Sequence, residues 1–102
     1  MTRPVQWSRD ALDDLKSQIA WIAAENPVAA QRVAERIRTA CSALGEMPTG
    51  RPGRVSGTYE KSVTRLPYIV AYALTRKAGR EVVAILRVIH TAREWPDEKW
   101  PR

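Results

Sequence analysis

Two arginines and the only histidine of the chain, Arg87, His90 and Arg93, lie within a stretch of seven residues. A histidine can accept or donate a proton near neutral pH, and an arginine can hold an anion through two parallel hydrogen bonds. Together they could transfer protons at a phosphate, or they could bind an acidic partner. A structural interpretation is also open, in which Arg87 pairs with a carboxylate such as Glu60 or Glu81 and His90 closes an apolar strand face.

These residues follow an apolar segment, residues 82–89, VVAILRVI, which is typical of a strand covered on both faces. Regular alternation along this strand would place Arg87 on the same face as Val83 and Ile85. Arg87 therefore interrupts an apolar face, and burying its charge would be costly without an anion beside it. We expect a defined anionic partner for Arg87, supplied by this chain or by another molecule.

The elements that would position these residues begin with a short strand at residues 3–7, followed by two amphipathic helices. Ser8 is a suitable cap for the first helix. Asn26-Pro27 ends that helix and starts the second, with an asparagine cap and a proline at the first helical position. Two adjacent helices with so short a break predict a helical hairpin, with Cys41 on the apolar face of its second helix.

Strands account for most of the second half of the chain. They are predicted over residues 58–65, 68–74 and 82–89, with a hairpin turn at residues 76–80. The predicted fold is therefore α+β and two-layered, with an N-terminal strand and a helical hairpin packed on a mostly antiparallel sheet. Without an internal repeat or linker, residues 1–102 are expected to form a single domain.

Charge is distributed unevenly along the chain. The formal net charge is +6, and all of the excess lies in residues 51–102, which hold eleven Lys or Arg against five Asp or Glu. Thirteen of the seventeen basic residues are arginines, which favour bidentate contacts with phosphate or carboxylate groups. This pattern favours an acidic partner, either a nucleic acid or an acidic protein segment, over a surface whose charge only aids solubility.

Composition also excludes several classes of protein. No apolar run approaches the ~20 residues of a membrane span, and the first residues lack the apolar core of a signal peptide, so a cytoplasmic location is expected. Cys41 stands alone, and no Cys or His spacing indicates a metal site. We expect no metal and no cofactor.

Two further segments are candidates for binding. The loop of residues 48–57, PTGRPGRVSG, carries Arg51 and Arg54 in a glycine-rich context, which favours a basic contact loop over simple solvent exposure. It lacks the pattern of a phosphate-cradling loop. Trp95, followed by a proline, is either a lid on the core or an exposed anchor for a partner.

Three segments in this order resemble the RelE/ParE superfamily of toxins from type II toxin–antitoxin modules. They are residues 50–54 (GRPGR), 67–72 (PYIVAY) and 86–93 (LRVIHTAR), behind a helical hairpin of suitable length. The resemblance covers nearly the whole chain. It implies either a RelE-like ribonuclease that cleaves mRNA on the ribosome or a ParE-like protein that acts on DNA gyrase without cleaving RNA.

The residues favour the ParE-like branch. RelE-like ribonucleases place an arginine where this chain has Ile69, and two lysines where it has Glu60 and Ser62, although a shift of one residue would bring in Lys61. Ile69 cannot stabilise an anion, and Glu60 would repel phosphate. A catalytic tyrosine near the C-terminus is also absent, because the last tyrosine is Tyr72.

The resemblance therefore implies a gyrase-inhibiting toxin that a cognate antitoxin neutralises, with operator DNA bound only through the antitoxin. The residues expected to bind antitoxin or target are Arg51, Arg54, Arg65, Arg87, Arg93 and Trp95. If the chain were a ribonuclease instead, its candidate catalytic residues would be Arg54, Arg87, His90 and Arg93.

Overall fold

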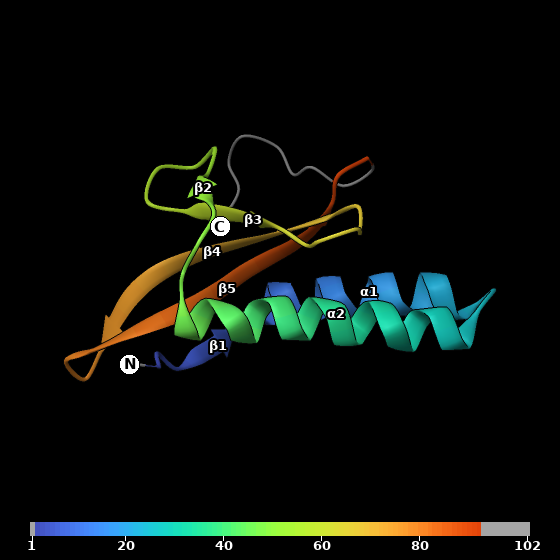
Figure 1. Ribbon diagram of the computed structural model, residues 1–102, viewed down its shortest axis with the longest axis horizontal. Helices are drawn as coiled ribbons and strands as arrows, with labels where there is room; N and C mark the ends of the chain where they lie inside the picture. Colours follow the sequence, from blue (N-terminus) through green and yellow to red (C-terminus); the bar gives the residue numbers. More distant parts are fainter. Residues whose placement is uncertain (1, 93–102) are drawn as a thin grey trace.

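The computed structural model describes residues 2–92 and contains two helices and five strands. In chain order the elements are β1 (Val5–Trp7), α1 (Arg9–Ala23), α2 (Pro27–Glu46), β2 (Arg51–Pro52), β3 (Tyr59–Ser62), β4 (Tyr68–Lys77) and β5 (Arg80–His90). The α1–α2 hairpin lies against one side of the sheet, as predicted (Figure 1).

The helices begin where the sequence indicates. The Ser8 side chain accepts a hydrogen bond from the Ala11 amide at 3.0 Å, and the Asn26 side chain accepts one from the Ala29 amide at 3.0 Å. Each cap satisfies one of the amide groups that a helix N-terminus leaves without an internal partner. Pro27 occupies the first turn of α2, where its missing N–H costs nothing.

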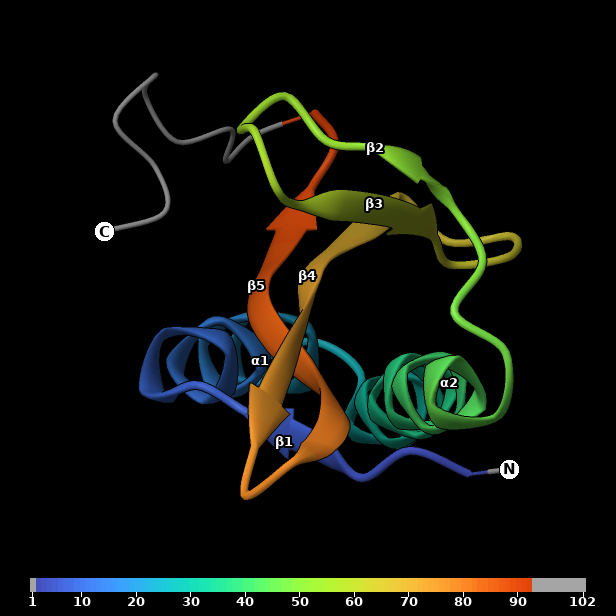
Figure 2. The same ribbon diagram turned by 90° about the vertical axis from the view of Figure 1, so that its left-hand side faces the viewer.

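The sheet is mixed, with the strand order β1-β5-β4-β3-β2. β1 runs parallel to β5, and the other neighbours are antiparallel. Figure 2 shows β4 and β5 crossing the molecule between the two helices and the β2–β3 end. The structure adds one strand to the prediction, because Arg51 and Pro52 of the expected loop pair with Glu60 and Tyr59 as β2.

The core lies between the helical hairpin and the sheet. Both helices contribute buried side chains, among them Leu15 from α1 and Ile37 and Cys41 from α2. The sheet contributes Val70, Tyr72, Val83, Ile85 and Val88 to the same cluster. Burial of this apolar surface is the main favourable contribution to folding.

A bulge in the β4–β5 ladder changes which β5 residues face the helices. The register shifts between Ala71 and Tyr72, which pair with Arg87 and Ile85 and leave Leu86 without an opposite residue. Val83, Ile85 and Val88 therefore belong to one cluster, and the expectation that Arg87 continues the face of Val83 and Ile85 is wrong. An extra residue in one strand reverses the alternation beyond it.

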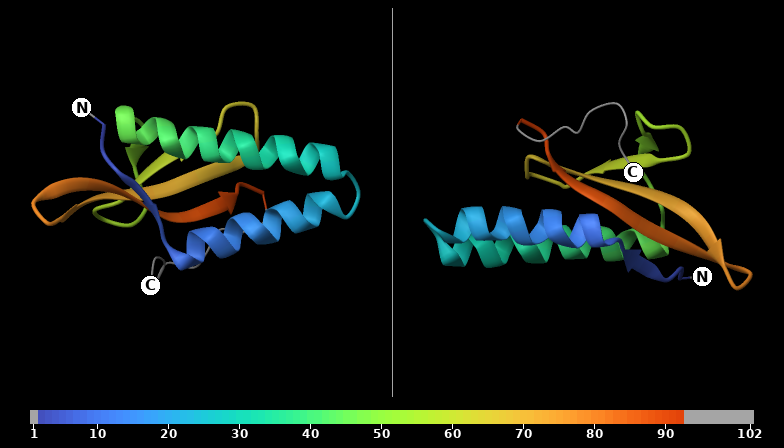
Figure 3. Two further views of the ribbon diagram at one scale, coloured as in Figure 1. Left: turned by 90° about the horizontal axis from the view of Figure 1, so that it is seen from below. Right: turned by 180° about the vertical axis from the view of Figure 1, so that it is seen from behind.

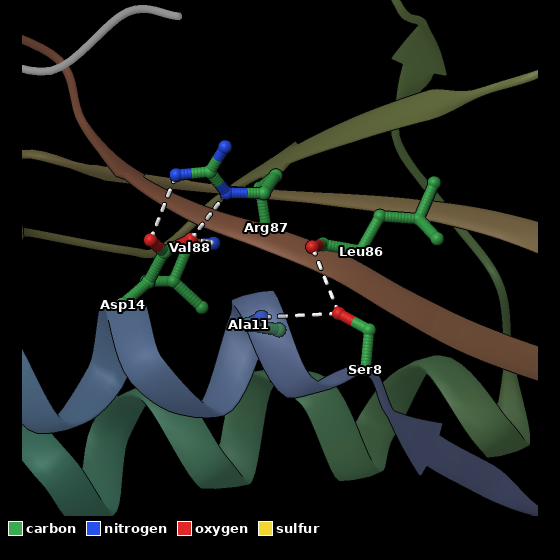
Figure 4. Close-up of polar contacts among 6 residues, drawn as sticks. All are labelled: Ser8, Ala11, Asp14, Leu86, Arg87 and Val88. Atoms are coloured by element: carbon green, nitrogen blue, oxygen red, sulfur yellow. Dashed lines mark hydrogen bonds and ion pairs between the residues drawn. The ribbon is translucent and has the colours of Figure 1, made fainter. Parts of the chain in front are cut away.

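The outer edge of β5 is covered by two different elements. β1 pairs only with Val83–Ile85, so the edge beyond Ile85 needs other partners. The Ser8 amide donates to the Ile85 carbonyl at 2.9 Å. The Ser8 hydroxyl donates to the Leu86 carbonyl at 3.0 Å (Figure 4). Ser8 thus caps α1 and also continues the edge of the sheet.

Asp14 of α1 completes this edge. Its carboxylate accepts a hydrogen bond from the Val88 amide at 2.9 Å and two from the Arg87 guanidinium, at 2.7 and 2.8 Å (Figure 4). The Arg87 and Asp14 side chains are only 26% and 16% exposed, so the pair is partly shielded from solvent. A bidentate, charge-assisted contact of this kind is stronger than a neutral hydrogen bond and fixes the position of α1 on β5.

Replacing Asp14 tests this edge. Asp14→Ala leaves the Arg87 guanidinium and the Val88 amide without their acceptor, so we expect a loss of about 2 kcal/mol in the free energy of unfolding. Urea denaturation measures it. Asp13→Ala is the matched control, because Asp13 is exposed on the same helix and its removal should change stability little. Equal effects of the two substitutions would contradict this role of Asp14.

Candidate functional site

The face of the sheet that points away from the helices carries the positions at which RelE-like ribonucleases place their basic residues. We call it the outer face. Its centre is formed by Ile69, Ala71 and Ile89, and Val55 of the preceding loop packs against Ala71 and Ile89. The ladder places Glu60 opposite Ala71 and Ser62 opposite Ile69 on this face. Lys61 lies opposite Val70, whose side chain belongs to the helix-side core, so Lys61 alternates to the other face.

Glu60 is the most unusual residue of the outer face, because its carboxylate is only 5% exposed. It accepts a hydrogen bond from the Arg54 amide at 3.0 Å. The Arg51 guanidinium approaches one carboxylate oxygen to 3.4 Å, and the Arg54 guanidinium lies 4.0 Å from the other. A buried carboxylate is tolerated only with such partners, so both arginines are oriented by a charge of their own chain.

These contacts fasten the 48–57 loop to β3. Gly50 has a φ of 129°, and a Cβ there would lie 2.6 Å from the Glu60 carbonyl oxygen, so no other residue fits without a shift. The Gly53 amide donates to the Thr58 carbonyl at 2.8 Å. The loop is thus held at several points, and Arg51 and Arg54 present exposed side chains from a fixed backbone.

Arg87 does have an anionic partner, as expected, but the partner is Asp14 of α1. Glu60 contacts Arg51 and Arg54 instead, and Glu81 pairs with Arg3. Both suggested partners of Arg87 were therefore wrong. The sequence could not identify Asp14 as this partner, because helix packing decides which carboxylate reaches β5. The one signal was an acidic residue six positions after the Ser8 cap.

His90 lies in a structural environment at the end of β5. Its ring contacts the Tyr68 ring edge-on, with centroids 5.2 Å apart, and its Nδ1 accepts a hydrogen bond from the Ala92 amide at 3.2 Å. The Tyr68 hydroxyl in turn donates to Gln18 of α1 at 3.3 Å. These contacts anchor the strand end to the helix, which agrees with the structural interpretation of His90.

The other predicted site residues are separate from this cluster. Arg65 is exposed in the turn between β3 and β4, with a φ of 65°, and no hydrogen bond or ion pair joins it to any described residue. Arg93 and Trp95 lie outside the described residues. Among the predicted site residues within 2–92, the structure therefore brings together only Arg51 and Arg54, around Glu60.

Two buried side chains that could in principle react are held in neutral form. Burial raises the pKa of the Cys41 thiol to about 12, which keeps it protonated and unreactive. Burial, and then the nearby Tyr59 hydroxyl, raise the pKa of Tyr72, whose hydroxyl donates to the Thr49 carbonyl. Both groups act as core residues.

Residues 2–92 hold neither a cluster of metal ligands nor a membrane-spanning helix. Among them, no three His, Cys, Asp or Glu side chains come together in a way that could hold a metal ion. Neither helix has the combination of length and apolarity that a bilayer crossing requires.

An apolar groove runs along the helical hairpin, whose two antiparallel helices lie side by side in Figure 3. Leu12, with 42% of its surface exposed, lies at its edge. Two basic side chains, Lys16 and Arg38, also line this groove, together with Leu15, Ile19, Ala20 and Ala34. An apolar floor with basic residues suits an amphipathic acidic segment.

Comparison with known proteins places the chain in a family. The family described as the ParE toxin of the type II toxin–antitoxin system parDE matches residues 5–95. A candidate toxin of Sinorhizobium fredii, Y4kP, is 41% identical over 93 residues, which are 90% of this chain and 92% of the relative. Toxin RelE2 of Caulobacter vibrioides is 35% identical over 89 residues, with 87% of this chain and 96% of the relative covered.

Solved structures show the same fold. A chain of the chromosomal ParDE system of P. aeruginosa superimposes with a TM-score of 0.78 at 22% identity, covering 87% of this chain and 96% of that one. A YoeB/ParE toxin of Agrobacterium tumefaciens gives a TM-score of 0.58 at 13% identity, covering 85% and 97%. The chain therefore belongs to the ParE family of type II toxin–antitoxin toxins, within the RelE/ParE superfamily.

Proposed function

We propose that this toxin arrests growth by binding DNA gyrase, without catalysing a reaction of its own. The observation that carries the proposal is the state of the basic residues on the sheet: Arg51 and Arg54 are oriented by Glu60, and Arg87 by Asp14. Ribonuclease chemistry needs cations directed at a phosphate and groups that transfer protons. Here the cations are directed at carboxylates of the chain itself.

The apolar packing of the outer face is also unfavourable for binding a phosphate. Ile69, Ala71 and Ile89 are buried, and Val55 packs over the last two. Entry of an RNA backbone would expose this apolar surface, which is unfavourable. It would also bring a phosphate close to the Glu60 carboxylate, and the two negative charges would repel each other. Gyrase as the target follows from the ParE-like resemblance, which the residue pattern on this face supports.

The alternative is a RelE-like ribosome-dependent ribonuclease. It is kept because one relative carries the name RelE2. In that case Arg54, Arg87, His90 and Arg93 would carry the reaction, with Arg54 the most accessible of those that the structure describes.

As a toxin of a type II module, the protein has a cognate antitoxin as its partner. We propose that an amphipathic segment of the antitoxin lies in the groove of the helical hairpin, with apolar side chains against Leu12 and Ile19 and acidic ones near Lys16 and Arg38. Arg65 would add a contact at the β3–β4 turn, and Arg51, Arg54, Arg87, Arg93 and Trp95 remain candidates for antitoxin or target binding.

The gyrase proposal predicts inhibition that follows the ratio of the two proteins. Purified toxin added to a DNA supercoiling assay should block supercoiling or accumulate cleaved DNA–gyrase complexes at micromolar excess. A docking inhibitor acts in proportion to its occupancy, so activity should return when the antitoxin removes the toxin. If supercoiling is complete at that excess, and circular dichroism shows that the toxin is folded, the proposal is wrong.

The docking proposal and the ribonuclease alternative differ in what they predict for mRNA in cells. If the toxin acts by docking, primer extension on cellular mRNA after its induction should show intact transcripts beside arrested growth. Codon-positioned cuts that disappear in Arg54→Ala but persist in the exposed control Arg9→Ala would establish the alternative and remove the docking proposal.

The groove is tested with Leu12→Asp. A carboxylate in an apolar contact is costly and repels an acidic segment, so we expect the Kd of the toxin–antitoxin complex to rise about tenfold or more, which is ~1.4 kcal/mol. Val28→Asp is the matched control, because Val28 is 58% exposed and lies outside this groove. Isothermal titration calorimetry measures both. If the two variants bind antitoxin equally well, the segment lies elsewhere.

A further inference from the structure

The end of the β4–β5 hairpin projects beyond the rest of the sheet (Figure 1). β3 pairs with β4 only as far as Tyr72, and β1 pairs with β5 only from Val83 onward. Residues 75–82, here called the hairpin arm, therefore form a two-stranded ribbon with no third strand from the described chain at either side. Residues 75–80 are all exposed.

The strands of this hairpin extend further, and its turn is shorter, than the turn predicted at residues 76–80. Lys77 pairs with Arg80, so only Ala78 and Gly79 form the turn. Both have positive φ values, 52° and 77°, as in the tight two-residue turns that match the twist of a hairpin. The Arg76 guanidinium donates to the Gly79 carbonyl at 3.1 Å, which holds the tip in shape.

Only part of the charge on the arm serves its own stability. Arg76 lies opposite Glu81 and donates to the Gly79 carbonyl, whereas Lys77 lies directly opposite Arg80, and like charges in opposite positions destabilise a ladder. The Lys77 ammonium group donates to the neutral side chain of Gln6 at 2.8 Å, and the Arg80 side chain makes no hydrogen bond or ion pair with any described residue. Glu81 is the one carboxylate of the arm, and it forms an ion pair with Arg3.

These cations surround a hollow at the base of the arm. Three guanidinium groups, those of Arg3, Arg76 and Arg80, line it against a single carboxylate, Glu81, and the N-terminal segment forms the opposite wall. Three positive charges against one negative charge leave an excess that an anion would neutralise. Lys77 adds a further positive charge at the tip.

We propose that the hairpin arm binds the phosphate backbone of duplex DNA, with phosphates at Lys77 and at the hollow lined by Arg76 and Arg80. Duplex DNA fits better than an acidic peptide, because the exposed arm residues include no large apolar side chain that could anchor a peptide. A two-stranded ribbon also has a width that the major groove of DNA accepts. Binding of phosphates requires only basic side chains at suitable positions. The inference is independent of gyrase as target.

Fluorescence anisotropy of a short labelled duplex, titrated with the full-length toxin over a range of salt concentrations, tests the proposal. The arm variant combines Arg76→Gln, Lys77→Gln and Arg80→Gln. The control variant combines Arg9→Gln, Arg32→Gln and Arg36→Gln, three exposed helix residues outside the groove of the helical hairpin. Of these, Arg36 makes one polar contact with the described chain, a hydrogen bond of 3.5 Å to the Thr64 carbonyl. Each variant lowers the formal net charge from +6 to +3, so a general charge effect would change both alike.

We expect the arm variant to bind DNA at least about tenfold more weakly. The negative slope of log K against log salt should become shallower by about 2 to 3, since each phosphate contact contributes about 0.9 to its magnitude. The control variant should keep most of the affinity. Arg80→Gln alone should give a smaller loss in the same direction, with circular dichroism unchanged.

Three results would overturn the inference. They are equal losses in the two triple variants, unchanged binding by the arm variant, and binding to an acidic peptide of matched charge in the absence of DNA binding. None of these results bears on gyrase inhibition, which the supercoiling assay measures separately.

Discussion

The structure depends on how the open edge of β5 is completed. β5 spans Arg80–His90, whereas its parallel neighbour β1 spans only Val5–Trp7. Backbone groups at the uncovered part need partners, because an unpaired, partly buried amide or carbonyl is costly. Helix α1 supplies them through Ser8 and Asp14, so the same contacts that satisfy the sheet also place the helical hairpin over it.

This arrangement links the fold to what the protein can do. Asp14 holds the Arg87 side chain as well as the Val88 amide, and an arginine used in this way is part of the scaffold. Glu60 has the corresponding effect on the loop that carries Arg51 and Arg54. The second half of the chain is strongly basic, and the positive charges of Arg51, Arg54 and Arg87 are matched locally. Among the residues that the structure describes, Arg65 and the arm residues Lys77 and Arg80 form no ion pair with a carboxylate, so their charge can meet a partner.

Most of the fold could be predicted from the sequence, because local signals determine it. The Ser8 and Asn26-Pro27 caps, the apolar spacing of both helices and the strands at Tyr68 and Val82 each follow from short-range preferences. The bulge beside Leu86 could not be predicted, since it arises from pairing between strands, and it reversed the face assigned to Arg87. The partners of Arg87 and Glu60 also depend on tertiary packing. The prediction that the RelE-like ribonuclease residues are missing needed only the residue identities at Glu60, Ser62 and Ile69, and it stays a prediction.

The burial of Glu60 has a consequence for how this toxin can diverge. Exchanging Glu60 for an apolar residue would release Arg51 and Arg54 toward solvent, but it would also remove the acceptor that fastens the loop backbone at Arg54. An exchange that frees the two arginines for an external anion while keeping the loop in place therefore has to preserve a hydrogen-bond acceptor at position 60, as glutamine would.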